Sequence, residues 1–156
     1  MNAPTASIDD LEQQERELVL DRFTHEDVWL LGSRLAERAL RERHPVMIDI
    51  RRTTGVLFRA AMAGTTSDQA AWIDRKSATA FRFEASTLLV GLRMDADGRD
   101  PFVDGWLDAA RYTLDGGAVP IRVAGAGVVA VATVSGLTSE EDHALVVDAL
   151  RSLLPG

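Results

Sequence analysis

Residues 116–137 read GGAVPIRVAGAGVVAVATVSGL, and this stretch decides the fold. Valine, isoleucine and alanine dominate it on both sides of a Gly-Ala-Gly segment, so it predicts two strands, 119–123 and 128–134, joined by a tight turn. No helix follows the glycines directly, as it would in a dinucleotide-binding loop. The stretch therefore predicts an antiparallel β-hairpin.

A second hairpin is predicted upstream, over 46–51 and 56–62. Val46, Ile48 and Ile50 lie on one face of the first strand, and the period of two resumes after a Thr-Thr-Gly turn. Antiparallel hairpins separated by helices indicate an α+β fold with one antiparallel sheet. Helical spacing and N-cap serine or threonine residues predict helices over 7–20, 24–44, 66–84, 86–94 and 137–154, and the pattern of 102–114 is mostly helical.

Composition narrows the functional class. The chain has 156 residues, 46% of them hydrophobic and 26% charged, which fits a single globular domain. A net charge of −7 argues against nucleic-acid binding, and no apolar run approaches the about 20 residues that span a bilayer. The absence of cysteine excludes disulfides and thiolate zinc sites, and three isolated histidines give no metal signature. Without the features of a secretory signal, the chain is predicted to be cytoplasmic, with no nucleic-acid or membrane partner.

Lys76 and the double glycine carry candidate chemistry. Lys76 projects from a mostly apolar helical stripe, so it holds an anionic ligand, acts as a base, or forms a structural ion pair. Gly116 and Gly117 admit close backbone approach, which suits an anion-binding loop or a tight strand entry. Pro120 has no N–H and is expected at a sheet edge, a strand start or a bulge.

Further polar residues gather between the strand 128–134 and the last helix. Ser135, Asp142 and His143 are the residue types of a hydrolase triad, but two adjacent residues are poorly placed to orient each other. His143 falls on the apolar stripe of the last helix. It is interpreted either as a base or as a histidine at the edge of the core.

Taken together, these motifs resemble a known family. Residues 72–76 (WIDRK), 116–121 (GGAVPI), 134–137 (VSGL) and 141–143 (EDH) are similar to the bacterial and fungal family labelled haem-degrading domain-containing protein, of the GlcG/HbpS-like superfamily. The resemblance covers about residues 20–154. It implies a profilin-like α/β sandwich, with an antiparallel sheet of about five strands flanked by helices, and homo-oligomers of at least two chains.

The resemblance also implies a domain division and a ligand site. We expect residues 1–20 to form an acidic helical extension, frayed over 1–6, and 21–156 to form one GlcG/HbpS-like domain. Haem binding is known for some relatives, so haem is a candidate ligand, but no cofactor is certain and no catalytic or metal residue carries over. The chain departs from the family at Gln69 and Asp115, where relatives often have asparagine and histidine. The candidate ligand-binding residues are Trp72, Arg75, Lys76, Gly116, Gly117, Pro120, Ser135 and His143.

Three functions fit these observations. We expect an oligomeric protein that binds haem or another small anionic ligand near Arg75, Lys76 and the double glycine, because arginine and lysine suit carboxylates. The alternatives are an enzyme of unknown reaction, with Lys76 or His143 as base, and a structural or protein-interaction module that uses the acidic N-terminal helix. The sequence does not decide whether the chain is an enzyme.

Overall fold

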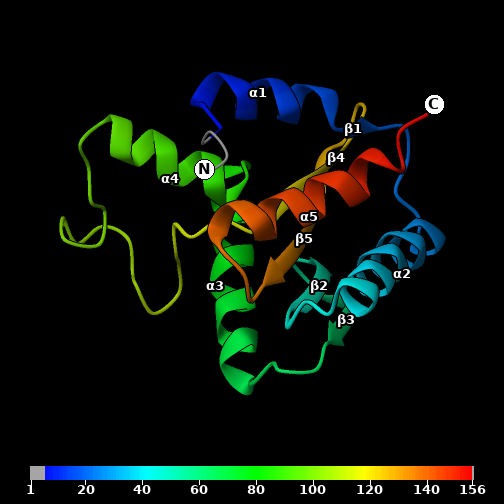
Figure 1. Cartoon of the computed structure of the whole chain (residues 1–156). Coiled ribbons are helices and arrows are strands. Elements are labelled where there is room, and N and C mark those ends of the chain that lie inside the picture. The colour runs from blue at the N-terminus through cyan, green and yellow to red at the C-terminus, as the bar shows by residue number, and fades with distance from the viewer. Residues whose placement is uncertain (1–5, 156) are drawn as a thin grey trace.

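A five-stranded sheet with helices on both faces organises the chain (Figure 1). The computed structural model describes residues 6–155, so residues 1–5 of the segment predicted to be frayed lie outside it. The elements are α1 (Ile8–Glu17), β1 (Val19–Leu20), α2 (His25–Glu42), β2 (Met47–Arg52), β3 (Gly55–Ala61), α3 (Ser67–Phe83), α4 (Thr87–Ala96), β4 (Ala118–Val123), β5 (Gly127–Ser135) and α5 (Ser139–Arg151).

The sheet has the strand order β1-β4-β5-β2-β3. Both predicted hairpins are confirmed, because β2 pairs with β3 and β4 pairs with β5, each antiparallel. The two hairpins join through antiparallel pairing of β5 with β2, in which Ile48 lies opposite Val134. Residues far apart in the sequence thus form one continuous core surface.

The N-terminal helix ends earlier than predicted, and a short strand follows it. Instead of continuing through residue 20, α1 ends at Glu17, and β1 runs parallel to β4, with Val19 opposite Arg122. The N–H of Ala124 donates to the carbonyl of Leu20 at 2.9 Å and extends this pairing. The sheet is therefore mixed, with four antiparallel strands and one parallel edge strand of two residues.

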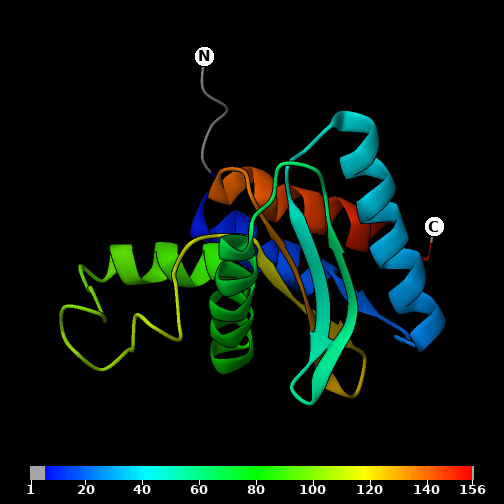
Figure 2. The same ribbon diagram turned by 90° about the horizontal axis from the view of Figure 1, so that it is seen from below.

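Helices cover the sheet on both sides. In Figure 2 the sheet separates α3 from α2, and α5 lies on the same side as α2. The main core packs side chains of α2 and α5 against Ile48, Ile121, Val134 and their neighbours. Because α3 packs on the other face of β2, β4 and β5, Asp49 of β2 has no exposed surface, whereas Arg59 and Ala61 of β3 stay exposed. The sequence pattern had suggested only one apolar face for this hairpin.

The predicted N-caps set the helix starts. The hydroxyls of Ser7, Thr24 and Thr66 each accept a backbone N–H of the first helical turn, and each forms a complete capping box. Thr138 accepts from the N–H of Glu141, whose carboxylate bonds the threonine hydroxyl rather than the cap backbone. Together these caps fix where each helix meets the sheet.

The prediction of helical structure over residues 102–114 is wrong. Asp100 accepts the N–H groups of Phe102 and Val103, and Asp108 accepts the N–H of Ala110. Such carboxylate-to-backbone bonds compete with a helix and stabilise turns. The segment is a chain of turns that leads from α4 back to β4.

The helix α1 packs on α4 as a small second cluster. Leu11 is buried there against Leu88 and Leu89. Ion pairs link Glu12 to Arg93 and Glu15 to Arg122. The division of the chain at residue 20 stays a prediction.

Over residues 6–155, the structure has no helix that is both long enough and apolar enough to span a bilayer.

Candidate functional site

Lys76 forms a buried ion pair with Asp142. Its ammonium lies 3.0 Å from the Asp142 carboxylate and also donates to the carbonyl of Val134 at 3.2 Å. Both side chains are almost fully buried, at 4% and 1% exposure. Burial raises the pKa of the Asp142 carboxyl above its usual value, while Lys76 and two backbone N–H groups act in the opposite direction. The pair ties α3 to the first turn of α5.

The double glycine packs directly against this pair. A Cβ at Gly117 would lie 2.4 Å from the Val134 oxygen and 2.8 Å from Nζ of Lys76, and Gly117 has a φ of +139°. A Cβ at Gly116 would lie 2.7 Å from the carbonyl oxygen of Ser139. The glycines therefore permit a tight entry into β4, beside Lys76.

A small polar cavity of about 220 Å³ lies over the ion pair. Trp72, Lys76 and Ser135 line it, and Asp115 contributes a carboxylate. The guanidinium of Arg75 lies 4.0 Å over the Trp72 ring. Three of the predicted ligand-binding residues thus line this cavity: Trp72, Lys76 and Ser135. Gly116 and Gly117 do not line it, but they pack against Ser139 and Lys76, which do.

Pro120 occupies an edge of β4. Val134 donates its N–H to the carbonyl of Gly117, so the alternation of an antiparallel pair turns the N–H groups of residues 118 and 120 away from β5. The N–H of Ala118 bonds the Thr87 hydroxyl on that side. β1 pairs only with Arg122 and Val123, so no strand of the described part of the chain lies opposite Pro120 there. The missing N–H of proline costs no ladder bond at this position.

His143 lies apart from the cavity and faces α1. Its Nε2 is 2.6 Å from Oε1 of Gln14, which places the ring proton on Nε2. Nδ1 is buried and has no hydrogen-bond partner among the described residues. Burial lowers the pKa of His143 to about 4, so the ring is neutral at neutral pH. The structure does not bring His143 together with Lys76 and the double glycine.

The buried histidine predicts acid sensitivity. Because the pKa is about 4 in the folded chain and near 6.5 when unfolded, unfolded chains bind the proton first as the pH falls. The stability contributed by the neutral ring is complete above pH 6.5 and is lost towards pH 4. Between pH 7 and pH 5 we expect a loss of about 2 kcal/mol in the free energy of unfolding from this group, measured by urea titration. His143→Gln should flatten the dependence by that amount, and His25→Gln, at an exposed position, should not; equal pH dependence in all three proteins would contradict it.

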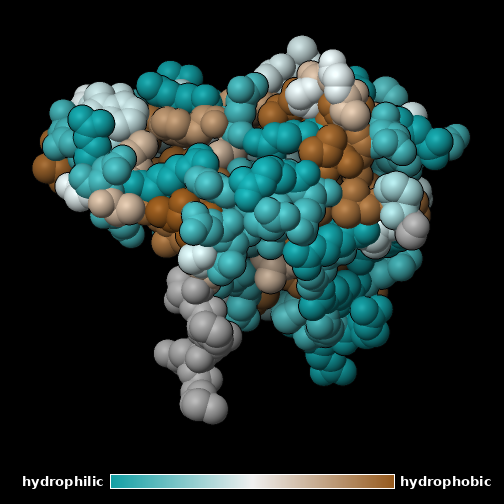
Figure 3. Space-filling model, turned by 90° about the horizontal axis from the view of Figure 1, so that it is seen from above, coloured by the Kyte–Doolittle hydropathy of each residue, from teal (hydrophilic) through white to brown (hydrophobic). Residues whose placement is uncertain are grey.

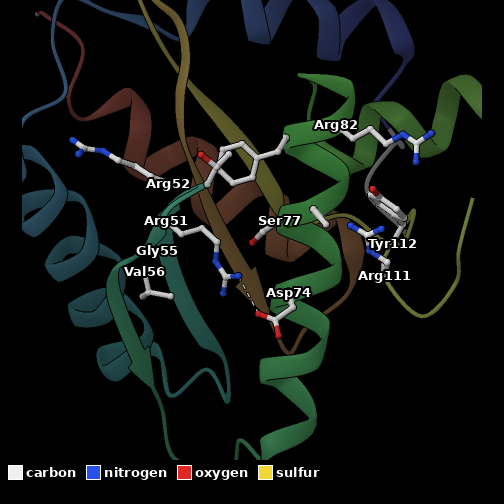
Figure 4. A pocket seen from close by; sticks show the side chains of 12 residues that line it. Arg51, Arg52, Gly55, Val56, Asp74, Ser77, Arg82, Arg111 and Tyr112 are labelled. Carbon is white, nitrogen blue, oxygen red and sulfur yellow. Dashed lines mark hydrogen bonds and ion pairs between the residues drawn. The ribbon is translucent and has the colours of Figure 1, made fainter.

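A larger cavity of about 520 Å³ lies between the β2–β3 hairpin, α3 and the loop before β4 (Figure 4). We call it the arginine pocket, because four arginines line it against a single carboxylate, that of Asp74. Phe81 adds an aromatic wall. The residues that define the pocket are Arg51, Arg52, Asp74, Arg82, Arg111 and Tyr112.

The buried carboxylate of Asp49 fixes the guanidinium of Arg51. Two parallel hydrogen bonds join them, from Nε to Oδ1 at 2.7 Å and from Nη2 to Oδ2 at 3.0 Å. Arg59 also donates to Asp49, at 3.1 Å. Burial opposes the charge of Arg51, but the carboxylates of Asp49 and Asp74 outweigh it and raise the pKa of the guanidinium above its usual value. Arg51 is a fixed and fully charged donor.

The other end of the arginine pocket combines cations with an aromatic ring. Tyr112 lies beside Arg82 and Arg111, whose guanidinium carbons are 5.1 and 5.5 Å from its ring centre. In Figure 4 Arg51 points at Asp74, whereas Arg82, Arg111 and Tyr112 lie together on the other side of α3, and Arg52 extends away.

Sequence reasoning missed the arginine pocket. Its residues come from three segments that are distant in the sequence, and none forms a motif alone. One signal was present: Asp74 and Arg82 are polar positions eight residues apart on one helix, which places them near one face.

The described residues contain no group of three or more histidine or carboxylate side chains that could hold a metal ion.

The fold and the site define a class: an α+β sandwich with a buried lysine–aspartate pair and an arginine-lined cavity. The family described as "Haem degrading protein HbpS-like" matches residues 23–151, and this chain belongs to it. The family expected from the sequence motifs is thereby confirmed.

Relatives and solved structures agree with this assignment. UPF0303 proteins of Streptomyces avermitilis and Streptomyces coelicolor are 47% and 46% identical, covering 97% of this chain and 93% and 97% of theirs. The crystal structure of Ybr137w protein has a TM-score of 0.86 at 32% identity, over 96% of this chain and 88% of that one. A PduOC:heme complex has a TM-score of 0.70 at 18% identity, over 83% and 93% of the two chains, which shows the fold alone.

Proposed function

We propose that this chain binds a small anionic ligand with a planar body in the arginine pocket, and that haem is the first candidate. One observation carries the proposal: four arginines and one carboxylate line a cavity of about 520 Å³. Arginine recognises carboxylates because its planar fork donates two parallel hydrogen bonds. Phe81 and Tyr112 offer the aromatic surfaces that a planar ligand needs.

The residues of the arginine pocket fit haem in two respects. They supply positive charge for its propionates and one side chain that can ligate its iron. Arg51, Arg82 and Arg111 would hold the propionates. Within residues 6–155 the lining of the arginine pocket includes no histidine or methionine, so the Tyr112 oxygen is the group there that can ligate iron. Bound haem would supply an iron centre with a further coordination position. The family description and the PduOC:heme neighbour support haem as the candidate.

The geometry favours binding over catalysis by Lys76 or His143. Lys76 lines the smaller cavity, but its ammonium is committed to Asp142 and to the Val134 carbonyl. His143 bonds Gln14 and lines neither of the two cavities described above. Its lowered pKa also makes it a weak base at neutral pH.

A haem titration tests the proposal. We expect a saturable shift of the Soret band, with one haem per chain. Arg82→Gln and Arg111→Gln should each weaken binding by about 1.5–3 kcal/mol, the range of a charge-assisted hydrogen bond. Tyr112→Phe should move the Soret band by removing the iron ligand, while iron-free protoporphyrin still binds.

Arg99→Gln is the matched control, since Arg99 is an exposed arginine outside the arginine pocket. It should bind haem like the parent chain. Haem binding that does not saturate, or that Arg99→Gln weakens as much as Arg82→Gln, would contradict the arginine pocket as the site.

We also propose that the chain forms a homo-oligomer, at least a dimer. Trp29 is 67% exposed and Trp106 41%, both large apolar surfaces for a small domain. Figure 3 shows a largely hydrophilic face that carries a hydrophobic patch near β1. Light scattering during the haem titration would report the mass of the assembly alongside the stoichiometry.

A further inference from the structure

Among residues 6–155, Asp74 is the single carboxylate that lines the arginine pocket. Its Oδ1 accepts a hydrogen bond from Nη1 of Arg51 at 3.0 Å (Figure 4). The same oxygen lies 4.0 Å from Nη2 of Arg59. It therefore occupies the place at Arg51 that a ligand carboxylate would need.

The two carboxylates around Arg51 differ in burial. Asp49 is fully buried and takes the Nε and Nη2 donors, so it fixes the guanidinium and leaves Nη1 directed at Asp74. The Asp74 side chain is 65% exposed. The Asp74–Arg51 pair contributes little free energy because water solvates the Asp74 carboxylate, and Arg51, which is 17% exposed, keeps both of its bonds to Asp49 when Asp74 leaves. Asp74 can thus leave Arg51 at small cost, whereas Asp49 cannot.

We propose that Asp74 is a displaceable carboxylate that competes with the ligand for Arg51 and so sets the affinity of the arginine pocket. This inference rests on the proposed function and names its ligand class: an aromatic compound with two separated carboxylates. One carboxylate replaces Asp74 at Arg51. The rest of the ligand extends across α3 towards Tyr112, Arg82 and Arg111, which line the other end of the arginine pocket.

Asp74→Asn tests the role of the charge. Asparagine keeps the size of the side chain but competes weakly for a guanidinium, and the exposed position should tolerate it. With terephthalate as the probe, followed by NMR of the arginine side chains, we expect binding to strengthen about three- to tenfold. The signal of Arg51 should shift on binding. The neutral analogue terephthalamide should show no such gain.

Asp68→Asn is the matched control. It removes the same charge from the same helix, and Asp68 does not line the arginine pocket. If Asp68→Asn strengthens binding equally, net charge explains the effect and the proposal is overturned. Unchanged or weaker binding by Asp74→Asn also overturns it, as does a failure of both proteins to bind terephthalate. The haem titration decides the proposed function separately, because terephthalate binding needs no iron ligand.

Discussion

A Lys76→Met variant is expected to lose about 3–5 kcal/mol in the free energy of unfolding, measured by urea titration. Methionine retains most of the apolar stem, so packing is largely kept. The Asp142 carboxylate, however, is 1% exposed and would stay buried without its cation. Removing one partner of a buried pair costs more than the pair contributes, because the remaining charge has neither water nor a counter-ion.

Arg75→Met is the control for this change. It replaces the neighbouring cation on the same helix, which stacks on Trp72 rather than pairing with a buried carboxylate. We expect it to cost no more than about 1 kcal/mol. Lys76→Met should also leave haem affinity unchanged in the fraction that is folded. A stable Lys76→Met protein with weakened haem binding would instead assign Lys76 to the ligand.

Leu150→Ala should cost about 2–5 kcal/mol. Leu150 is 2% exposed and packs in the main core, with Val146 and Val147 of the same helix. The substitution removes apolar contacts and leaves a cavity between α5 and the sheet, and both effects destabilise the folded chain. Thermal or urea unfolding measures the loss.

The same substitution at Leu40 provides the comparison. Leu40 is 73% exposed on α2, so Leu40→Ala should change the stability by less than about 0.5 kcal/mol. A loss for Leu150→Ala that is no larger than for Leu40→Ala would contradict the packing of α5 on the sheet.

The sequence predicted the elements that local chemistry specifies. The strand period of two around Ile48 and the N-caps at Thr24 and Thr66 depend on residues only a few positions apart. They can therefore be predicted from the sequence without knowledge of the fold. β1 was missed because two residues carry no periodic signal. Its pairing partner, Arg122, lies about a hundred positions away, and only the folded sheet brings the two together.

The candidate site was predictable only in part. The residues around Lys76 shared a motif set, and the structure places three of the predicted ones, Trp72, Lys76 and Ser135, at one small cavity. The arginine pocket depends on tertiary contacts among three segments, so no local pattern announces it. Asp49 illustrates the reason. An acidic residue in a strand is expected to face solvent, but α3 covers that face of β2 and Asp49 is fully buried.

Pro120 bears on how this sheet can associate with other sheets. On the side of β4 that faces away from β5, the N–H of Ala118 donates to the Thr87 hydroxyl, and Pro120 has no N–H. Beyond them, β1 is too short to template another strand. Strand addition is therefore confined to the opposite edge, β3, and a chain with one open edge can pair with one other copy but cannot propagate a fibre. Pro120 and the Ala118–Thr87 bond together leave this part of the β4 edge without a free N–H for an added strand.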